Sequence, residues 1–203
     1  MKNLISIFTA TLLVAGLLVA GCSTVGVKTT MGPPEQVFNP AEFEGDWQLS
    51  TTEGDDTQTY NVKRLQDGTL RFATLEWDII RGEHVVVNTD AQFMLIADEP
   101  FLQLKSEEPD SLYYFYRITQ VGEGEIIIHP PSIEPFAQAV ASGILEGTVD
   151  SSREDGTPNS VELAHGPQLR DYLDNAPASS LFPAGSTWEM RARRTNQTTP
   201  TFQ

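Results

Sequence analysis

The amino-acid sequence predicts a mainly β fold, an antiparallel barrel or a strongly curved sheet with two short helices. The first observation is that apolar and polar residues alternate through about eleven short segments rich in β-branched and aromatic residues. The second is Asp67-Gly68, a strong hairpin turn between two of these segments. The third is a pair of helical patterns late in the chain. Closure into a barrel would remove the exposed strand edges that a long-lived protein must otherwise protect.

The predicted strands follow from this alternation. Trp47 and Leu49 alternate after Gly45, and Tyr60, Val62 and Arg64 share one face of the next segment. Residues 70–79 are apolar on both faces, which leaves their buried face ambiguous. The remaining predicted strands are 83–88, 91–97, 101–105, 112–119, 125–129, 144–149, 160–164 and 187–193.

An unbroken row of aromatic residues covers positions 113–116 in one of these strands. Successive side chains of a strand point to opposite faces, so Tyr113 and Phe115 lie on one face and Tyr114 and Tyr116 on the other. Both faces are then apolar or amphipathic. The row indicates a strand buried on two sides by ordinary core packing, or a strand that lines a pocket.

The two helices are predicted near residues 132–142 and 167–174. Ser132 is the expected N-cap of the first helix, and Gly143 ends it. Pro167 begins the second helix, where its missing N–H is tolerated. The apolar faces consist of Ile133, Phe136, Ala137 and Val140 in the first helix and of Leu169, Tyr172 and Leu173 in the second.

Residues 1–21 have the pattern of a cleavable signal peptide, with one positive charge followed by an apolar run over 4–20. The run ends in Val19-Ala20-Gly21-Cys22, which resembles the lipobox of bacterial lipoproteins. The resemblance implies cleavage after Gly21, a diacylglycerol on the Cys22 thiol and usually a third acyl chain. Several acyl chains make membrane attachment effectively permanent. Because Ser23 replaces the aspartate of a retention signal, the resemblance favours the outer membrane.

The mature chain carries most of its charge as carboxylates. It keeps 12 of the 13 basic residues and all 28 acidic residues, which disfavours binding to nucleic acid or to anionic lipid headgroups. Its 182 residues suit one domain. We predict a lipidated tether over 22–40, a β-rich domain over 41–194 and a disordered tail over 195–203.

The first predicted strand opens with Gly45-Asp46-Trp47, which resembles the Gly-x-Trp signature of lipocalins. The resemblance implies a ligand-holding antiparallel barrel, described more broadly as calycin-like, in which the tryptophan closes the floor. It also implies that an arginine of the last strand packs across the tryptophan ring, here Arg191 or Arg193. The sequence departs from lipocalins because both predicted helices precede the last strand.

No catalytic residue, metal site or cofactor is predicted. His84, His129 and His165 each lack a second ligand at metal-binding spacing and are expected on the surface or in turns. The acidic clusters at 55–56 and 107–110 do not match a calcium loop. Motifs for a serine elbow or phosphate loop are missing. As the only cysteine is Cys22, its lipidation would leave no disulfide or catalytic thiol.

These patterns favour an outer-membrane-anchored periplasmic lipoprotein that works as a non-enzymatic binding module. Its partners would be the membrane, through the lipid on Cys22, and either a small apolar ligand or an envelope protein, with no nucleic acid. The residues that bind the ligand are not predicted. One alternative is a structural or assembly lipoprotein without a ligand pocket, and a second is an unrecognised hydrolase.

Overall fold

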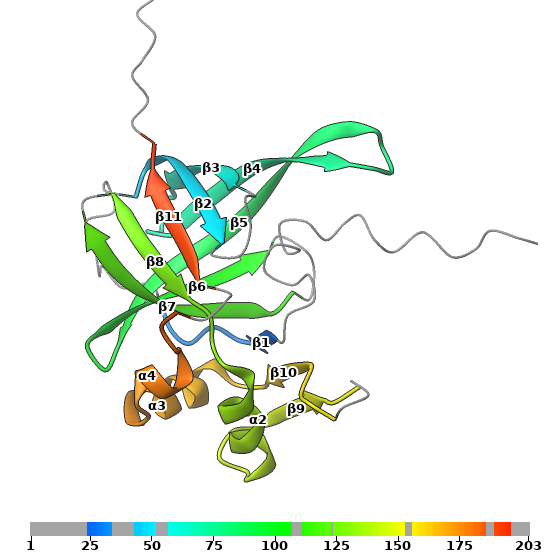
Figure 1. Cartoon of the computed structure of the whole chain (residues 1–203), viewed down its shortest axis with the longest axis vertical. Helices are drawn as coiled ribbons and strands as arrows, with labels where there is room; N and C mark the ends of the chain where they lie inside the picture. Colours follow the sequence, from blue (N-terminus) through cyan, green and yellow to red (C-terminus); the bar gives the residue numbers. More distant parts are fainter. Residues whose placement is uncertain are drawn as a thin grey trace, which may run out of the picture.

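The computed structural model describes residues 24–33, 43–51, 57–106, 111–122, 124–152, 156–185 and 189–195. The predicted signal peptide, Cys22, both acidic clusters and all of the predicted tail except Thr195 lie outside these residues. The described chain is mainly β and forms a closed antiparallel barrel, which confirms the predicted fold class (Figure 1). Three helices and three further strands lie beside the barrel.

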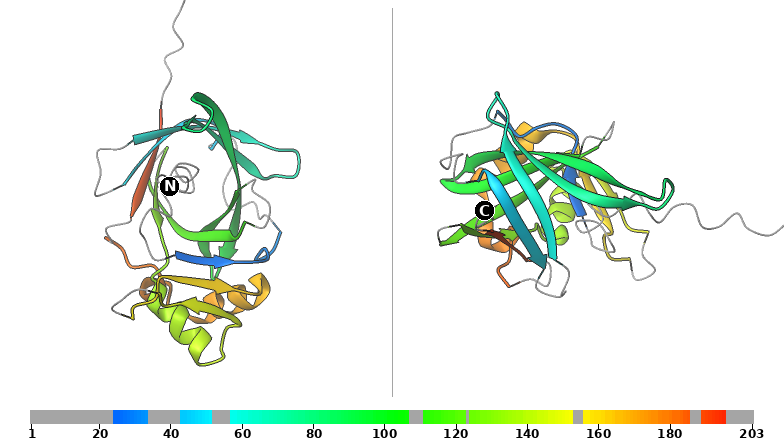
Figure 2. Two further views of the ribbon diagram at one scale, coloured as in Figure 1. Left: turned by 90° about the vertical axis from the view of Figure 1, so that its right-hand side faces the viewer. Right: turned by 90° about the horizontal axis from the view of Figure 1, so that it is seen from above.

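Eight strands build the barrel, and each is antiparallel to its neighbours. The last strand lies between the eighth strand of the chain and the first barrel strand, and this closes the ring (Figure 2). In order around the barrel, the strands are β2 (Gly45–Thr51), β3 (Thr57–Arg64), β4 (Leu70–Asp78), β5 (Glu83–Ile96), β6 (Glu99–Ser106), β7 (Tyr113–Gly122), β8 (Glu125–His129) and β11 (Met190–Arg194).

A small helical layer is inserted between β8 and β11, below the barrel in Figure 1. Both predicted helices are confirmed, with Gly143 in the left-handed conformation (φ +74°) after the first and Pro167 in the first turn of the second. A third helix was not predicted. The inserted elements are α2 (Ile133–Ala141), β9 (Gly147–Asp150), β10 (Ser160–Leu163), α3 (Gly166–Asn175) and α4 (Ala178–Leu181).

The prediction of a tether over 22–40 is wrong for residues 24–33. Strand β1 (Thr24–Val27) pairs in parallel with β10 and antiparallel with the start of β7, and Val25 and Val27 are buried. The following turn packs so closely on α3 that a Cβ on Gly166 would lie 2.1 Å from the Thr30 carbonyl oxygen. Because the partners of β1 are distant in the sequence, this four-residue segment gave no local signal.

Two predicted strands, 83–88 and 91–97, are one continuous strand, β5. Asn88 and Asp90 resemble a turn in the sequence, but they occupy alternate positions of the strand and face outward. There Asp90 accepts two hydrogen bonds from the Arg71 guanidinium of β4, at 2.8 and 2.9 Å. The polar pair makes the outer face of the barrel hydrophilic at this point without interrupting the strand.

Parts of β5, β6 and β7 are apolar on both faces, and the two faces belong to different hydrophobic cores. Tyr114 and Tyr116 belong to the core inside the barrel, whereas Tyr113 and Phe115 belong to a second core between the outer wall and the helices. The expectation that this aromatic row is buried on two sides is confirmed. The aromatic centre of the second core is Phe101, Phe115, Phe136 and Phe182, with most of the ring pairs edge to face.

Candidate ligand-binding site inside the barrel

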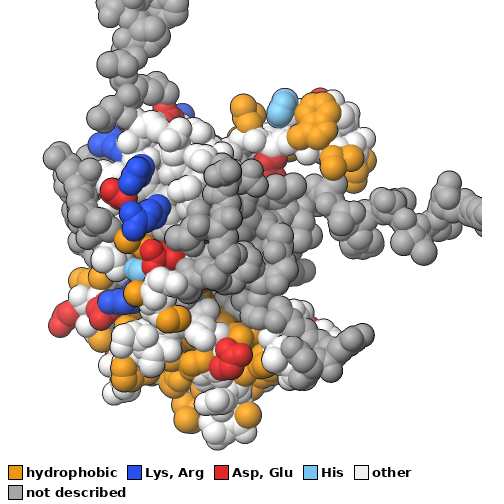
Figure 3. All heavy atoms as spheres, in the orientation of Figure 1, with side chains coloured by type: hydrophobic (Ala, Val, Ile, Leu, Met, Phe, Trp, Pro, Cys, Tyr) orange, Lys and Arg blue, Asp and Glu red, His pale blue; other side chains and the backbone are white. Residues whose placement is uncertain are grey.

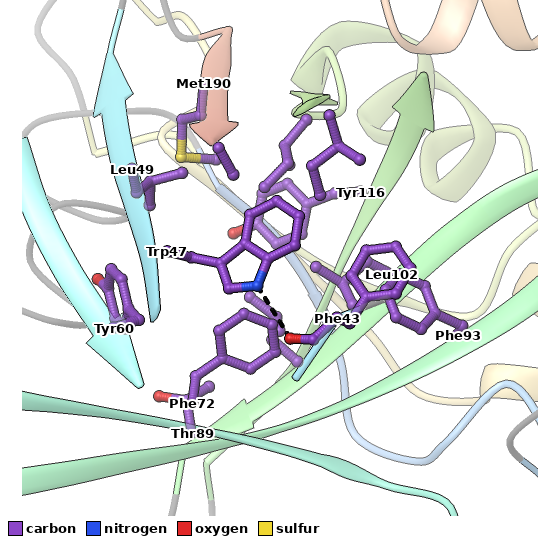
Figure 4. Close-up of a pocket in the computed structure, with 14 residues that line it drawn as sticks. Phe43, Trp47, Leu49, Tyr60, Phe72, Thr89, Phe93, Leu102, Tyr116 and Met190 are labelled. Atoms are coloured by element: carbon purple, nitrogen blue, oxygen red, sulfur yellow. Dashed lines mark hydrogen bonds between the residues drawn. The ribbon is translucent and has the colours of Figure 1, made fainter. Parts of the chain in front are cut away.

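The barrel encloses an apolar cavity of about 70 Å³. Every one of the eight barrel strands contributes at least one side chain to its wall, so the cavity is produced by closure of the barrel (Figure 4). The wall consists of Phe43, Trp47, Leu49, Tyr60, Phe72, Thr89, Phe93, Leu102, Leu104, Tyr116, Ile126, Ile128, Met190 and Ala192. None of these residues is charged, which makes the cavity suited to a neutral apolar group.

Trp47 forms part of this wall and is held by the residues just before β2. Its indole Nε1 donates a 2.9 Å hydrogen bond to the Phe43 carbonyl oxygen, drawn as a dashed line in Figure 4. The Phe43 ring stacks on Trp47, with ring centres 5.6 Å apart, and also lies 4.6 Å from the Phe93 ring. The single polar atom of the indole is therefore satisfied away from the cavity, and its ring faces are left for apolar contacts.

The glycine of the Gly-x-Trp motif has a conformational role. Gly45 begins β2 with φ +119°, a value that residues with a Cβ rarely adopt. The Arg194 guanidinium lies beside it, 3.5 Å from the position that a Cβ would occupy. A side chain at position 45 would thus be strained by its backbone conformation, although its Cβ would meet the Arg194 guanidinium at an ordinary contact distance.

The predicted contact of Arg191 or Arg193 with the Trp47 ring is wrong. Both arginines face outward and contact the Glu125 carboxylate, at 3.5 and 3.1 Å. Their neighbours Met190 and Ala192 are the residues of β11 that face the cavity, because side chains alternate along the strand. The arginine opposite Trp47 in register is Arg194, whose Nη2 donates to the Glu44 carbonyl oxygen at 2.7 Å.

Three side chains with hydroxyl groups, Tyr60, Thr89 and Tyr116, contribute to the otherwise apolar wall. The Tyr60 hydroxyl donates to Gln58 Oε1 of the same strand. Burial raises the pKa of the Tyr60 phenol to about 12, and the nearby Glu76 carboxylate adds to this shift. The phenol therefore stays neutral at physiological pH, and the wall carries no charge even where it is polar.

The size of the cavity restricts what it can hold in this conformation. An engineered cavity of about 150 Å³ in another protein binds benzene, so 70 Å³ is enough only for a smaller or narrower apolar group. A bulkier ligand would have to displace a side chain of the wall. Phe43 is the candidate, because it precedes β2 and its backbone is not part of the barrel sheet.

The histidines divide into two kinds. His84 and His165 are exposed, as predicted, but His129 at the end of β8 is buried. Its Nε2 lies 3.0 Å from Thr119 Oγ1, and its Nδ1 lies 3.4 Å from Glu189 Oε2. Burial lowers the pKa of His129, Arg117 lowers it further, and Glu189 opposes the shift. Among the described residues, no three His, Cys, Asp or Glu side chains converge on a possible metal site.

A second cavity, of about 170 Å³, lies on the outer wall of the barrel and is polar. Gln92 and Gln103 face each other there across β5 and β6, and Gln103 Oε1 accepts a 2.9 Å hydrogen bond from the Thr30 hydroxyl. The Gln103 Nε2 and Gln92 Oε1 atoms are buried and have no hydrogen-bond partner among the residues that the structure describes. Their chemistry and the size of the space suit ordered water, which satisfies such groups in many proteins.

The fold and the cavity together define a class, an eight-stranded antiparallel barrel with an apolar interior. No protein-family model matches the chain, and no curated protein sequence matches it. In the part of the chain that the structure describes, no helix has the length and apolar character needed to cross a membrane.

Proposed function

We propose that the protein is a lipoprotein of the outer membrane that faces the periplasm and binds a small apolar ligand inside its barrel without catalysing a reaction. The observation that carries this proposal is the convergence of all eight strands on an uncharged, apolar cavity. A buried void costs stability, since its lining atoms lose packing contacts. A ligand that fills the void would recover those contacts.

The lipobox at Cys22 supports the proposed location. An acyl anchor would keep the barrel next to a bilayer, where apolar molecules are concentrated because they are poorly soluble in water. The barrel would then offer such a molecule a second apolar environment. The acidic surface of the domain would take no part in this step, because the ligand is uncharged.

The arrangement around Gly45-Asp46-Trp47 supports the resemblance to lipocalins, as part of the proposal. The motif opens the first barrel strand, and an arginine of the last strand, Arg194, reaches the backbone beside it. Trp47 also packs in the wall of the cavity. These features are consistent with a lipocalin-like or more broadly calycin-like binding barrel, with Arg194 in place of the predicted arginines.

The test is saturable binding of an uncharged fluorescent probe, N-phenyl-1-naphthylamine, to the mature chain. Residues 23–203 would be exported with an ordinary signal peptide, so that the protein is soluble without detergent. The probe is larger than the cavity, so we expect weak binding by the wild type, in which Phe43 must be displaced, and tighter binding by Phe43→Ala, which removes that ring from the wall. Ala192→Leu fills the cavity and should weaken binding, whereas Ile144→Ala, in an exposed loop, should leave it unchanged.

Absence of saturable binding by both the wild type and Phe43→Ala would overturn the ligand-binding proposal. Such a result would favour a structural or assembly lipoprotein, in which the barrel serves only as a scaffold. Equal loss of binding in Ala192→Leu and Ile144→Ala would also count against the cavity, because it would place the probe elsewhere on the protein.

A further inference from the structure

The hairpin of β4 and β5 extends beyond the barrel wall. Pairing of β3 with β4 ends at Ala73, and pairing of β6 with β5 ends at Thr89. Beyond these points β4 and β5 pair only with each other, as far as Asp78 and Glu83. At about 3.3 Å per residue, this two-stranded ribbon reaches on the order of 15 Å from the barrel before its turn. Figure 1 shows it projecting at the upper right.

One face of this ribbon is apolar and exposed. Leu75 lies opposite Val86, and Trp77 lies opposite His84, with the two rings edge to face at 5.1 Å. Among the described residues, seven large apolar side chains are exposed, and five of them are on the hairpin. Figure 3 shows apolar side chains gathered on the part of the hairpin that projects from the barrel. These five, with their exposed fractions, are Leu75 (67%), Trp77 (54%), Ile79 (64%), Ile80 (75%) and Val86 (62%).

The turn is built to hold Ile79 and Ile80 at its tip. Asp78 Oδ1 accepts hydrogen bonds from the backbone N–H groups of Ile80 and Arg81, at 2.9 and 3.0 Å. The N–H of Gly82, at φ +67°, donates to the Asp78 carbonyl oxygen at 2.7 Å. A ribbon of two strands is marginally stable alone in water, so an ordered tip that exposes two isoleucines calls for an environment that covers them.

The other face of the ribbon is acidic apart from Val85, which lies opposite Glu76. Glu76, Asp78 and Glu83 occupy the strand positions that alternate with the apolar ones. The hairpin is therefore amphipathic, with no carboxylate on the face that carries Leu75 and Trp77. Such a surface suits a boundary between water and an uncharged apolar phase, and it does not suit attraction to anionic headgroups.

The position of β1 indicates that the apolar phase near the hairpin tip is the lipid bilayer. In the top view of Figure 2, β1 and the hairpin tip lie toward the same side of the molecule, whereas Figure 1 shows β1 at the base of the barrel and the tip at its upper right. Cys22 precedes Thr24 by only two residues, a span of at most about 7 Å even when fully extended. A lipid on Cys22 would thus hold this side of the domain at the surface of the bilayer, without the long spacer that the sequence indicated.

We propose that the tip of the β4–β5 hairpin inserts into the interface of the bilayer that holds the lipid anchor, an inference that rests on the proposed lipidation of Cys22. Ile79 and Ile80 enter the region of the acyl chains, and Trp77 lies at the level of the headgroups, where tryptophan is enriched in membrane proteins. The acidic face of the ribbon remains in water. The domain then has two contacts with the membrane, which fix its orientation.

The test uses the full-length lipidated protein in vesicles of phosphatidylcholine whose acyl chains carry bromine, a short-range quencher of tryptophan. We expect quenching that disappears in Trp77→Phe, which assigns it to that residue. The double variant Ile79→Ser/Ile80→Ser should lose the quenching of Trp77, whereas the matched control Ile144→Ser, another exposed isoleucine (57%), should retain it. Unchanged thermal unfolding of these surface variants checks that they fold.

Mass spectrometry of the same samples separates the two proposals. One outcome is that Cys22 carries acyl chains but the quenching is insensitive to Trp77→Phe or to the double serine variant. That outcome would overturn the proposed insertion of the hairpin and would leave the proposed lipid anchor intact. The absence of acyl chains on Cys22 would overturn both. A photo-crosslinker at position 80 could instead capture an envelope protein in cells while Trp77 stays unquenched in vesicles. That result would overturn insertion into lipid and would indicate that the hairpin tip binds a protein.

Discussion

The molecule has two hydrophobic cores that share the same strands but are filled differently. The second core, between the outer wall of the barrel and the helices, has four interlocking phenylalanine rings at its centre. The core inside the barrel contains as many aromatic side chains, yet it retains an apolar cavity of about 70 Å³. Filled cores contribute most to stability, whereas an unfilled one can take up a ligand.

The difference follows from geometry. The sides of an eight-stranded barrel are fixed by its hydrogen bonds, so its interior cannot collapse onto a void. The helices of the second core are joined to the barrel by loops and can settle against its wall until the rings are in contact. In the proposed function, stability and ligand binding thus belong to opposite faces of β5, β6 and β7.

The largest expected effect is on the second core. Phe136→Ala should lower the free energy of unfolding by about 3–5 kcal/mol, because Phe136 is fully buried and contacts three other rings. Phe43→Ala beside the cavity should cost less, at the lower end of this range, about 3 kcal/mol, since Phe43 precedes β2 and its neighbours can relax into the space. Denaturant unfolding measures both changes. Equal losses would remove the proposed distinction between the cores.

The next effect concerns His129. Its folded-state pKa is lowered, so at mildly acidic pH the unfolded state binds a proton that the folded state does not. Stability should therefore fall as the pH drops below about 6.5 and continue to fall toward the folded-state pKa, by at most about 1.4 kcal/mol per pH unit. His129→Gln removes the titrating group, and its unfolding free energy should depend less on pH between 7.5 and 5.5. Identical pH profiles would show that burial of His129 does not control this dependence.

The smallest effect comes from filling the cavity. Ala192→Val adds two methyl groups to a residue of the cavity wall and should raise the free energy of unfolding by up to about 1 kcal/mol. Ala91→Val is the matched control, because Ala91 is also a fully buried strand residue of the barrel core but does not line the cavity. There the extra volume should destabilise by about 1–3 kcal/mol. If both variants lose stability, the cavity is not available to additional atoms.

Much of the fold could be predicted because its signals are local. The alternation around Trp47 and Tyr60 identified strand residues and the faces they share, and the turn at Asp67-Gly68 identified a hairpin. Both larger helices followed from their apolar stripes and from Gly143 and Pro167. The aromatic row at 113–116 also indicated a strand buried on two sides, although not which element would cover its outer face.

The candidate site was predicted only in part. The Gly-x-Trp motif identified Trp47 correctly as a residue of the barrel wall, but the arginine beside the motif is Arg194, one position beyond the predicted Arg193. That error is one of register, and a shift of one residue exchanges the two faces of a strand. Phe43 was missed as a lining residue because it lies outside any periodic segment.

The sequence by itself determined where most of the barrel strands and the two longer helices form, since these depend on neighbours a few positions apart. It also predicts the lipid anchor, because a lipobox is a linear signal. Only the tertiary structure decided that β11 closes the ring against β2 and that β1 pairs with β10. It also decided that the β4–β5 ribbon extends beyond the strands on either side of it. Each of these depends on which distant strands pair and where their pairing stops. The cavity is a consequence of that closure, and no local pattern encodes it.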